Sequence, residues 1–142
     1  MMELASTLSP KLGLPQLRGS AHELAAAAKR VYDGWDQVDG MDEELGAGGI
    51  CQDVAGAMAE VLSAKGFDVI TVHASVGENH VYLVTLTEDG VFSVDIPPSV
   101  YEIGSGYVWE KRSDARFEPD VVEFMRLEDV MTADEFEARY QD

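Results

Sequence analysis

A chain of 142 residues, 46% of them hydrophobic, is long enough to form one globular domain whose core needs neither a metal nor a disulfide. Its 27 acidic and 10 basic residues give a formal net charge of −17, which repels phosphate backbones and argues against nucleic-acid binding. No apolar run is long enough to span a membrane, and the first twenty residues lack the basic and apolar pattern of a signal peptide. We therefore expect a cytoplasmic protein with no membrane partner.

The acidic excess and the single cysteine each allow more than one interpretation. The acidic residues are typical of a solubilising surface, but they would also suit a basic protein partner, mimicry of DNA or a salt-rich habitat. Cys51 has no second cysteine to pair with, which favours a reducing compartment. A lone cysteine is usually a small buried hydrophobe, so a catalytic role has to be argued from its neighbours.

The N-terminal part predicts an irregular lead-in over residues 1–19, followed by a single domain over residues 20–142. Ser20 and Glu23 form a capping-box pattern that opens a helix ending near Asp33 and Gly34. The apolar residues of this helix recur at helical spacing: Leu24, Ala28, Val31 and Trp35. The glycine-rich and acidic residues 36–49 then predict a loop.

Cys51 is predicted to begin a second helix. One apolar stripe of this helix contains Cys51, Ala55, Met58 and Leu62, which turns the thiol toward the protein body. Lys65 and Gly66 are typical of a helix end. The free N–H groups and the positive end of the dipole at a helix start stabilise an anion, so we expect a thiolate there to form more easily than in a free cysteine.

Three strands are predicted next, over residues 67–74, 80–87 and 91–96, and the last two should form a hairpin. If Leu86 pairs with Val91, Tyr82 lies opposite Asp95. His80 then shares a face of the sheet with Asp95. The parity of the hairpin therefore permits an imidazole and a carboxylate to meet.

These residues have the complementary roles that thiol catalysis needs. Cys51 would attack a carbonyl carbon, His80 would hold and return the proton, and Asp95 would orient the imidazole. The backbone N–H of Cys51 is the expected oxyanion donor. A second donor or a substrate contact is open between four side chains: Gln52, Gln37, Trp35 and Tyr82.

Other uses of the histidines are less favoured. His73 lies within a predicted strand with no acidic residue at hairpin distance, so we prefer His80 as the base. One cysteine and two distant histidines do not have the spacing of a zinc site, so no metal is expected. We expect no cofactor, because the sequence has no phosphate-binding glycine-rich loop.

Beyond Pro98 the chain is expected to continue the sheet. Gly104 to Gly106 predict a turn, residues 107–112 and 120–127 predict strands, and Thr132 with Glu135 predicts a capping box. The terminal helix that this box opens should place Phe136 and Tyr140 on one face. Three aromatic side chains could flank a cleft, although packing in the core or at an edge is favoured: Tyr101, Tyr107 and Trp109.

Several of these residues together resemble a known family. The run Gly49-Ile50-Cys51-Gln52-Asp53-Val54-Ala55, followed by His80-Val81 and Val94-Asp95, is similar to the transglutaminase-like core of the papain-like cysteine enzymes. The resemblance implies an α+β fold in which the cysteine-bearing helix packs on an antiparallel sheet. It also implies acyl transfer through a thioester, as a cysteine protease, deamidase or amide cross-linking enzyme.

A second resemblance is to the arylamine N-acetyltransferases. Gly48-Gly49-Ile50-Cys51, His80-Val81-Tyr82-Leu83 and Val94-Asp95 are similar to their Cys-His-Asp order. The sequence therefore predicts a thiol hydrolase or acyltransferase acting on a protein, peptide or small amide. The alternative from another class is a non-catalytic acidic module that binds a basic protein or mimics DNA.

Overall fold

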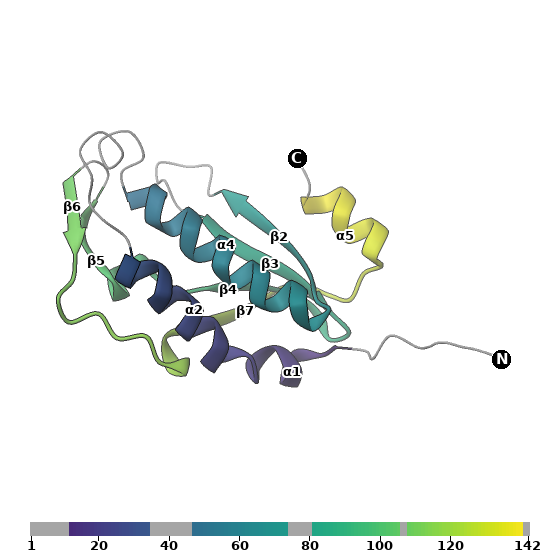
Figure 1. Cartoon of the computed structure of the whole chain (residues 1–142). Coiled ribbons are helices and arrows are strands. Elements are labelled where there is room, and N and C mark those ends of the chain that lie inside the picture. The colour runs from purple at the N-terminus through teal and green to yellow at the C-terminus, as the bar shows by residue number, and fades with distance from the viewer. Residues whose placement is uncertain (1–11, 35–46, 74–80, 106–107, 141–142) are drawn as a thin grey trace.

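The computed structural model describes residues 12–34, 47–73, 81–105 and 108–140 (Figure 1). Its α-helices are α1 (Leu14–Arg18), α2 (Ala21–Gly34), α4 (Ala47–Lys65) and α5 (Ala133–Tyr140). Its strands are β2 (Asp68–His73), β3 (Val81–Thr87), β4 (Gly90–Asp95), β5 (Glu102–Ser105), β6 (Val108–Lys111) and β7 (Glu123–Glu128). Two short 3-10 helices are η1 (Pro98–Val100) and η2 (Pro119–Val121).

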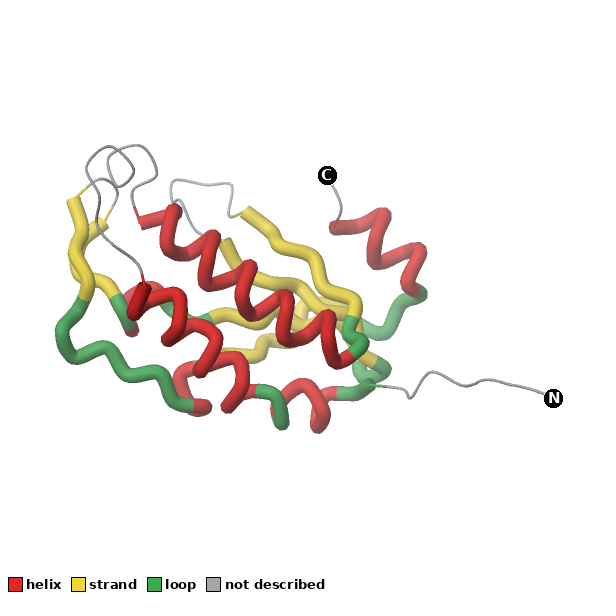
Figure 2. Tube along the Cα trace, viewed as in Figure 1, coloured by secondary structure: helices red, strands yellow, loops and turns green. Residues whose placement is uncertain are grey.

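The main sheet has four strands in the order β2-β3-β4-β7, and every neighbouring pair is antiparallel. Helices α2 and α4 lie side by side, and α4 packs on β2 and β3 (Figure 2). A second, smaller apolar cluster around Val84, Val91 and Phe136 joins α5 to the other face of the sheet. β5 and β6 form a separate two-stranded ribbon. This is a mixed helix-and-sheet architecture, compatible with the α+β class that the sequence predicts.

The predicted apolar stripe of α4 is confirmed. Cys51, Ala55, Met58 and Leu62 are each no more than 2% exposed and belong to the main core. The predicted helix end is also confirmed, because Gly66 follows the last helical residue with a φ of +102°, a conformation that glycine adopts without strain. The predicted start is wrong: α4 begins at Ala47, so Cys51 lies in its second turn.

The hairpin of β3 and β4 has the predicted register. Leu86 pairs with Val91, and Thr87 pairs with Gly90, so the connection is a two-residue turn. The Thr87 hydroxyl donates to the carbonyl of Gly90 over 2.8 Å and accepts the N–H of Asp89 over 3.0 Å, which closes this turn. The turn thus sets which side chains of both strands share a face.

The N-terminal prediction is wrong at two places. Residues 14–18 form α1 instead of irregular chain, and its Leu17 is fully buried. The Leu14 N–H donates to the Asp89 carboxylate over 2.7 Å, so the hairpin turn anchors this helix. The Ser20 hydroxyl donates to the carbonyl of Gln16 over 3.1 Å instead of capping α2 with Glu23. A tertiary contact and a preceding helix therefore replace the local signals used in the prediction.

The C-terminal part confirms the last helix and changes the strands before it. Residues 104 and 105 belong to β5 where a turn was predicted, and β7 starts at Glu123 instead of Asp120. The capping box is present: the Thr132 hydroxyl accepts the Glu135 N–H over 3.1 Å, and the Glu135 carboxylate accepts the Thr132 N–H over 2.9 Å. Phe136 and Tyr140 share one face, with ring centroids 5.4 Å apart, a spacing typical of aromatic pairs.

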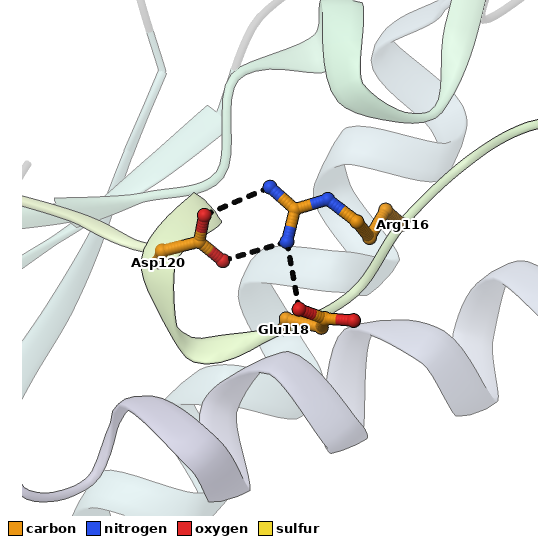
Figure 3. A network of polar contacts seen from close by, with 3 residues as sticks. All are labelled: Arg116, Glu118 and Asp120. Atoms are coloured by element: carbon orange, nitrogen blue, oxygen red, sulfur yellow. Dashed lines mark hydrogen bonds and ion pairs between the residues drawn. The ribbon is translucent and has the colours of Figure 1, made fainter.

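The segment that leads into β7 is held by an ionic network around Arg116 (Figure 3). Its guanidinium donates to Glu118 over 2.8 Å and, through two nitrogens, to both oxygens of Asp120, each over 2.8 Å. These hydrogen bonds lower the pKa of Asp120. The network joins Arg116 to the start of η2, which lies against α2.

Among the described residues, no helix is both long enough and apolar enough to cross a membrane.

Candidate active site around Cys51

The Cys51 thiol lies beside the hydroxyl of Tyr101. The sulfur and the phenolic oxygen are 3.1 Å apart, and either atom can be the donor. Cys51 is 2% exposed and Tyr101 is 1% exposed, so this polar contact is closed off from solvent. It joins α4 to the residue that follows η1, fifty positions further along the chain.

Tyr101 is held firmly from several sides. Its N–H donates to the Pro98 carbonyl over 3.0 Å, and its carbonyl accepts the Arg112 N–H over 2.9 Å. Its ring stacks on Phe117 with centroids 6.1 Å apart. The hydroxyl is therefore positioned against the sulfur by backbone hydrogen bonds and ring packing together.

The pKa of the Tyr101 phenol is raised well above its ordinary value. Burial is the largest cause, followed by the negative charge and hydrogen bond of Cys51, then the charges of Glu102 and Asp95. Each of these disfavours a phenolate. Tyr101 consequently remains neutral at physiological pH, and its hydroxyl can donate a hydrogen bond to an anionic sulfur or oxygen.

The helix start found in the structure changes the expected oxyanion donor. In an α-helix that begins at Ala47, the N–H of Cys51 points to the carbonyl of Ala47, because N–H groups bond four residues back. Only the N–H groups of the first turn are free. The prediction that the Cys51 N–H is a free donor is therefore wrong.

Asp95 and Tyr82 lie on the face of the sheet away from the α4 cluster. Val81, Leu83 and Val94 belong to the same core cluster as Cys51. Asp95 and Tyr82, which alternate with them, line a 230 Å³ pocket together with Ser93, Glu123, Met125 and Leu127. Asp95 ends β4, and its charge is the last in order of the causes that raise the pKa of Tyr101. Among the described residues, the structure does not bring the Asp95 carboxylate to the Cys51 thiol, and these two predicted site residues lie on opposite sides of the sheet.

The remaining predicted site residues divide into two groups. His80, Gln37 and Trp35 lie outside the described residues, as does Tyr107. Gln52 is exposed on α4 and lines a groove of about 660 Å³ between α2, α4 and the first two strands. Val81, the residue after His80, lines the same groove, together with Arg30, Asp53 and Glu60.

Within the described part of the chain, no three histidine, cysteine, aspartate or glutamate side chains are grouped so that they could hold a metal ion. In comparisons with known proteins, no family model, curated protein or solved structure matched the chain.

The residue that sequence reasoning missed is Tyr101. It was expected to pack in the core, and it does, but its hydroxyl also contacts the thiol. No spacing rule links two residues fifty positions apart in a helix and after a 3-10 turn. The only sequence signal was an aromatic residue with a polar atom, which normally needs a hydrogen-bond partner when it is buried.

Proposed function

We propose that this protein is a thiol hydrolase or acyltransferase that acts on an amide or peptide bond, with Cys51 as its nucleophile. In this proposal α4 and the sheet are the core of a papain-like, transglutaminase-like fold. The observation that supports it best is the contact of the Cys51 sulfur with the Tyr101 hydroxyl. A nucleophile and a hydrogen-bond donor are thus joined on the α4 side of the sheet, while Asp95 lies at the end of β4 and lines the pocket on the other face.

The proposed reaction has two halves. The Cys51 thiolate attacks the carbonyl carbon, and the carbonyl oxygen becomes an oxyanion. His80, oriented by Asp95, gives its proton to the leaving amine as the carbon–nitrogen bond breaks and a thioester remains. Water or an amine then attacks the thioester, His80 takes its proton, and the thiolate leaves.

Tyr101 is the oxyanion donor in this proposal, in place of the Cys51 N–H. A neutral phenol 3.1 Å from the sulfur can stabilise the thiolate before attack and donate to the oxyanion that forms next to it. The 660 Å³ groove is the proposed approach for a protein, peptide or small amide substrate, because it is lined by Gln52 and Val81, which follow the proposed nucleophile and base in the sequence. The cytoplasm is the proposed location, since a lone catalytic thiol stays reduced there.

Alkylation of the native protein tests the nucleophile. We expect iodoacetamide to modify Cys51 rapidly at about pH 6 to 7, as expected of an activated thiol, and His80→Ala to slow the reaction. His73→Ala is the matched control, because it removes the other nearby histidine and should leave the rate unchanged. A thiol that reacts only near the ordinary cysteine pKa of about 8.5, with no response to His80→Ala, would overturn the proposal.

Intact-mass spectrometry tests the acyl transfer. The protein is incubated with amide, peptide and acyl-CoA donors, and an acyl adduct on Cys51 is expected that Cys51→Ala lacks. An adduct from amide or peptide donors supports the proposed class. An adduct from acyl-CoA alone would replace it with an acetyltransferase-like activity.

A further inference from the structure

Large exposed apolar side chains of the described residues gather on one strand and its end. Met125 is 60% exposed and Leu127 is 39% exposed, both in β7, and Val130 follows the strand at 60% exposed. β7 turns Phe124, which is partly buried, toward the main core, and Met125 and Leu127 alternate with it along the strand. Exposed apolar side chains that lie next to one another on a protein surface often mark an interaction site.

Met125 and Leu127 line the 230 Å³ pocket with Tyr82 and Ser93, and Asp95 and Glu123 complete it. We call these six residues the β7 groove. Asp95 pairs with Glu123 in the sheet register, so the two carboxylates lie together at the N-terminal end of β7. The groove therefore has an apolar length and an acidic end.

In the part of the chain that the structure describes, no strand pairs with the outer edge of β7. Among the described residues, β7 pairs with β4 on one side and is the last strand of the sheet. Alternate N–H and C=O groups of an edge strand point away from the sheet, where they can bind an added strand. Arg126, which could protect such an edge, instead lies over the Phe92 ring and donates to the Asp89 carbonyl.

The negative charge of the groove distinguishes between two possible binding partners, a second copy of the chain and a basic protein. The described residues that line the groove include two carboxylates and no lysine or arginine. A second copy of the chain would bring another net charge of −17 and its own Glu123 and Glu128 to the same edge. Like charges in that position repel, whereas a basic segment is attracted.

We propose that an extended segment of a basic protein partner pairs with the outer edge of β7 as a fifth, antiparallel strand, and that its side chains on one face contact the β7 side of the groove. Two apolar side chains two residues apart would lie against Leu127 and Met125, and a lysine or arginine two residues further would meet Glu123 and Asp95. The inference goes beyond the proposed function and holds whether or not Cys51 is catalytic.

Fluorescence anisotropy with synthetic peptides tests the proposal on the full chain carrying Cys51→Ala, in which no turnover can occur. The probe is labelled Thr-Val-Thr-Val-Thr-Lys-Thr, whose two valines and lysine share one face of a strand. The matched peptide Thr-Val-Thr-Val-Lys-Thr-Thr has the same composition with the lysine on the other face. We expect the first peptide to bind roughly fivefold more tightly at low salt, and the difference to shrink as salt is added. Equal affinity would overturn the proposed recognition.

Two surface variants locate the site. Met125→Lys places a positive charge in the groove and should weaken binding of the first peptide by roughly tenfold. Val130→Lys is the matched control, with the same 60% exposure and the same change outside the groove, and should leave binding within about twofold. Equal losses of peptide affinity in Met125→Lys and Val130→Lys would contradict the assignment of the binding site to the β7 groove.

Two further measurements map the bound peptide and test for self-association. Amide NMR shifts on adding the first peptide to the Cys51→Ala chain should concentrate in residues 123–128, and shifts confined to another surface would overturn the proposal. Sedimentation equilibrium should show a monomer. A dimer that Met125→Lys dissociates would assign the groove to self-association instead of a basic partner.

Discussion

The Cys51 sulfur lies 3.1 Å from the Tyr101 hydroxyl, and both side chains are almost completely buried. A buried polar atom is costly unless it has a partner, so each of these groups satisfies the other. The contact also ties α4 to the chain that follows β4. Structure and proposed chemistry therefore depend on the same pair of atoms.

Tyr101→Phe should slow the alkylation of Cys51 at neutral pH, because the neutral phenol no longer donates to the anionic sulfur. The ring and its stacking on Phe117 remain, so we expect the free energy of unfolding to fall by only about 0.5 to 1.5 kcal/mol. The rate of iodoacetamide labelling and urea unfolding measure the two effects. Tyr32→Phe removes a neighbouring phenol that contacts Arg112 and serves as the control. An unchanged labelling rate in Tyr101→Phe would show that the hydroxyl does not support the thiolate.

The stability of the fold should decrease at alkaline pH. The pKa of Tyr101 is raised by burial, and burial with the Glu128 hydrogen bond raises the pKa of Tyr140 to about 12. Above about pH 10, tyrosines of the unfolded chain lose protons that the folded chain keeps, which favours unfolding. Tyr101 and Tyr140 each contribute fully to the free energy of unfolding below about pH 10. Each contribution is lost as the pH rises toward the pKa of that tyrosine in the folded protein.

Urea unfolding between about pH 8 and 11 measures this effect. Tyr101→Phe and Tyr140→Phe should each make the loss of unfolding free energy less steep, because a phenylalanine has no proton to lose. If the free energy of unfolding fell equally steeply with pH in both variants and in the unsubstituted protein, the loss could not be assigned to these two tyrosines.

Gly90→Ala should destabilise the hairpin. Gly90 has a φ of +132°, and an added Cβ would lie 2.6 Å from the carbonyl oxygen of Glu128 in β7. Strain of this kind costs about 1 to 3 kcal/mol, which chemical denaturation measures. Gly56→Ala is the matched control, because its Cβ would meet no atom within 4 Å and α4 should gain about 0.5 to 1 kcal/mol. If Gly90→Ala and Gly56→Ala changed the free energy of unfolding equally, an added side chain at Gly90 would not strain the backbone.

Thr132→Ala should loosen α5, since it removes the hydroxyl that accepts the Glu135 N–H. Loss of such a cap costs about 1 kcal/mol. Hydrogen exchange of the α5 amides should accelerate, while Thr132→Ser, which keeps the hydroxyl, should exchange like the unsubstituted protein. Unchanged protection in Thr132→Ala would mean that Phe136 alone secures the helix.

Local patterns were enough for several elements. The apolar stripe from Cys51 to Leu62, the register of Leu86 with Val91 and the cap of Thr132 with Glu135 were all predicted and found. Each depends on residues close in sequence: a helical period, a short turn or a capping pair. The prediction was wrong for residues 14–18, for the start of α4 and for residues 104 and 105. Residues 14–18 form α1, which is held by Asp89, seventy-five positions away from Leu14.

Residue patterns alone predict an acidic chain of mixed helices and strands, with Cys51 turned inward and Tyr82 on the same side of the hairpin as Asp95. The contact of the Tyr101 hydroxyl with the sulfur depends on how the elements pack, as does the position of Asp95 in a groove on the face opposite the α4 cluster. Periodicity shows which way a side chain points within its own element. The packing of distant elements decides what it meets there, because such contacts follow from how whole surfaces fit together.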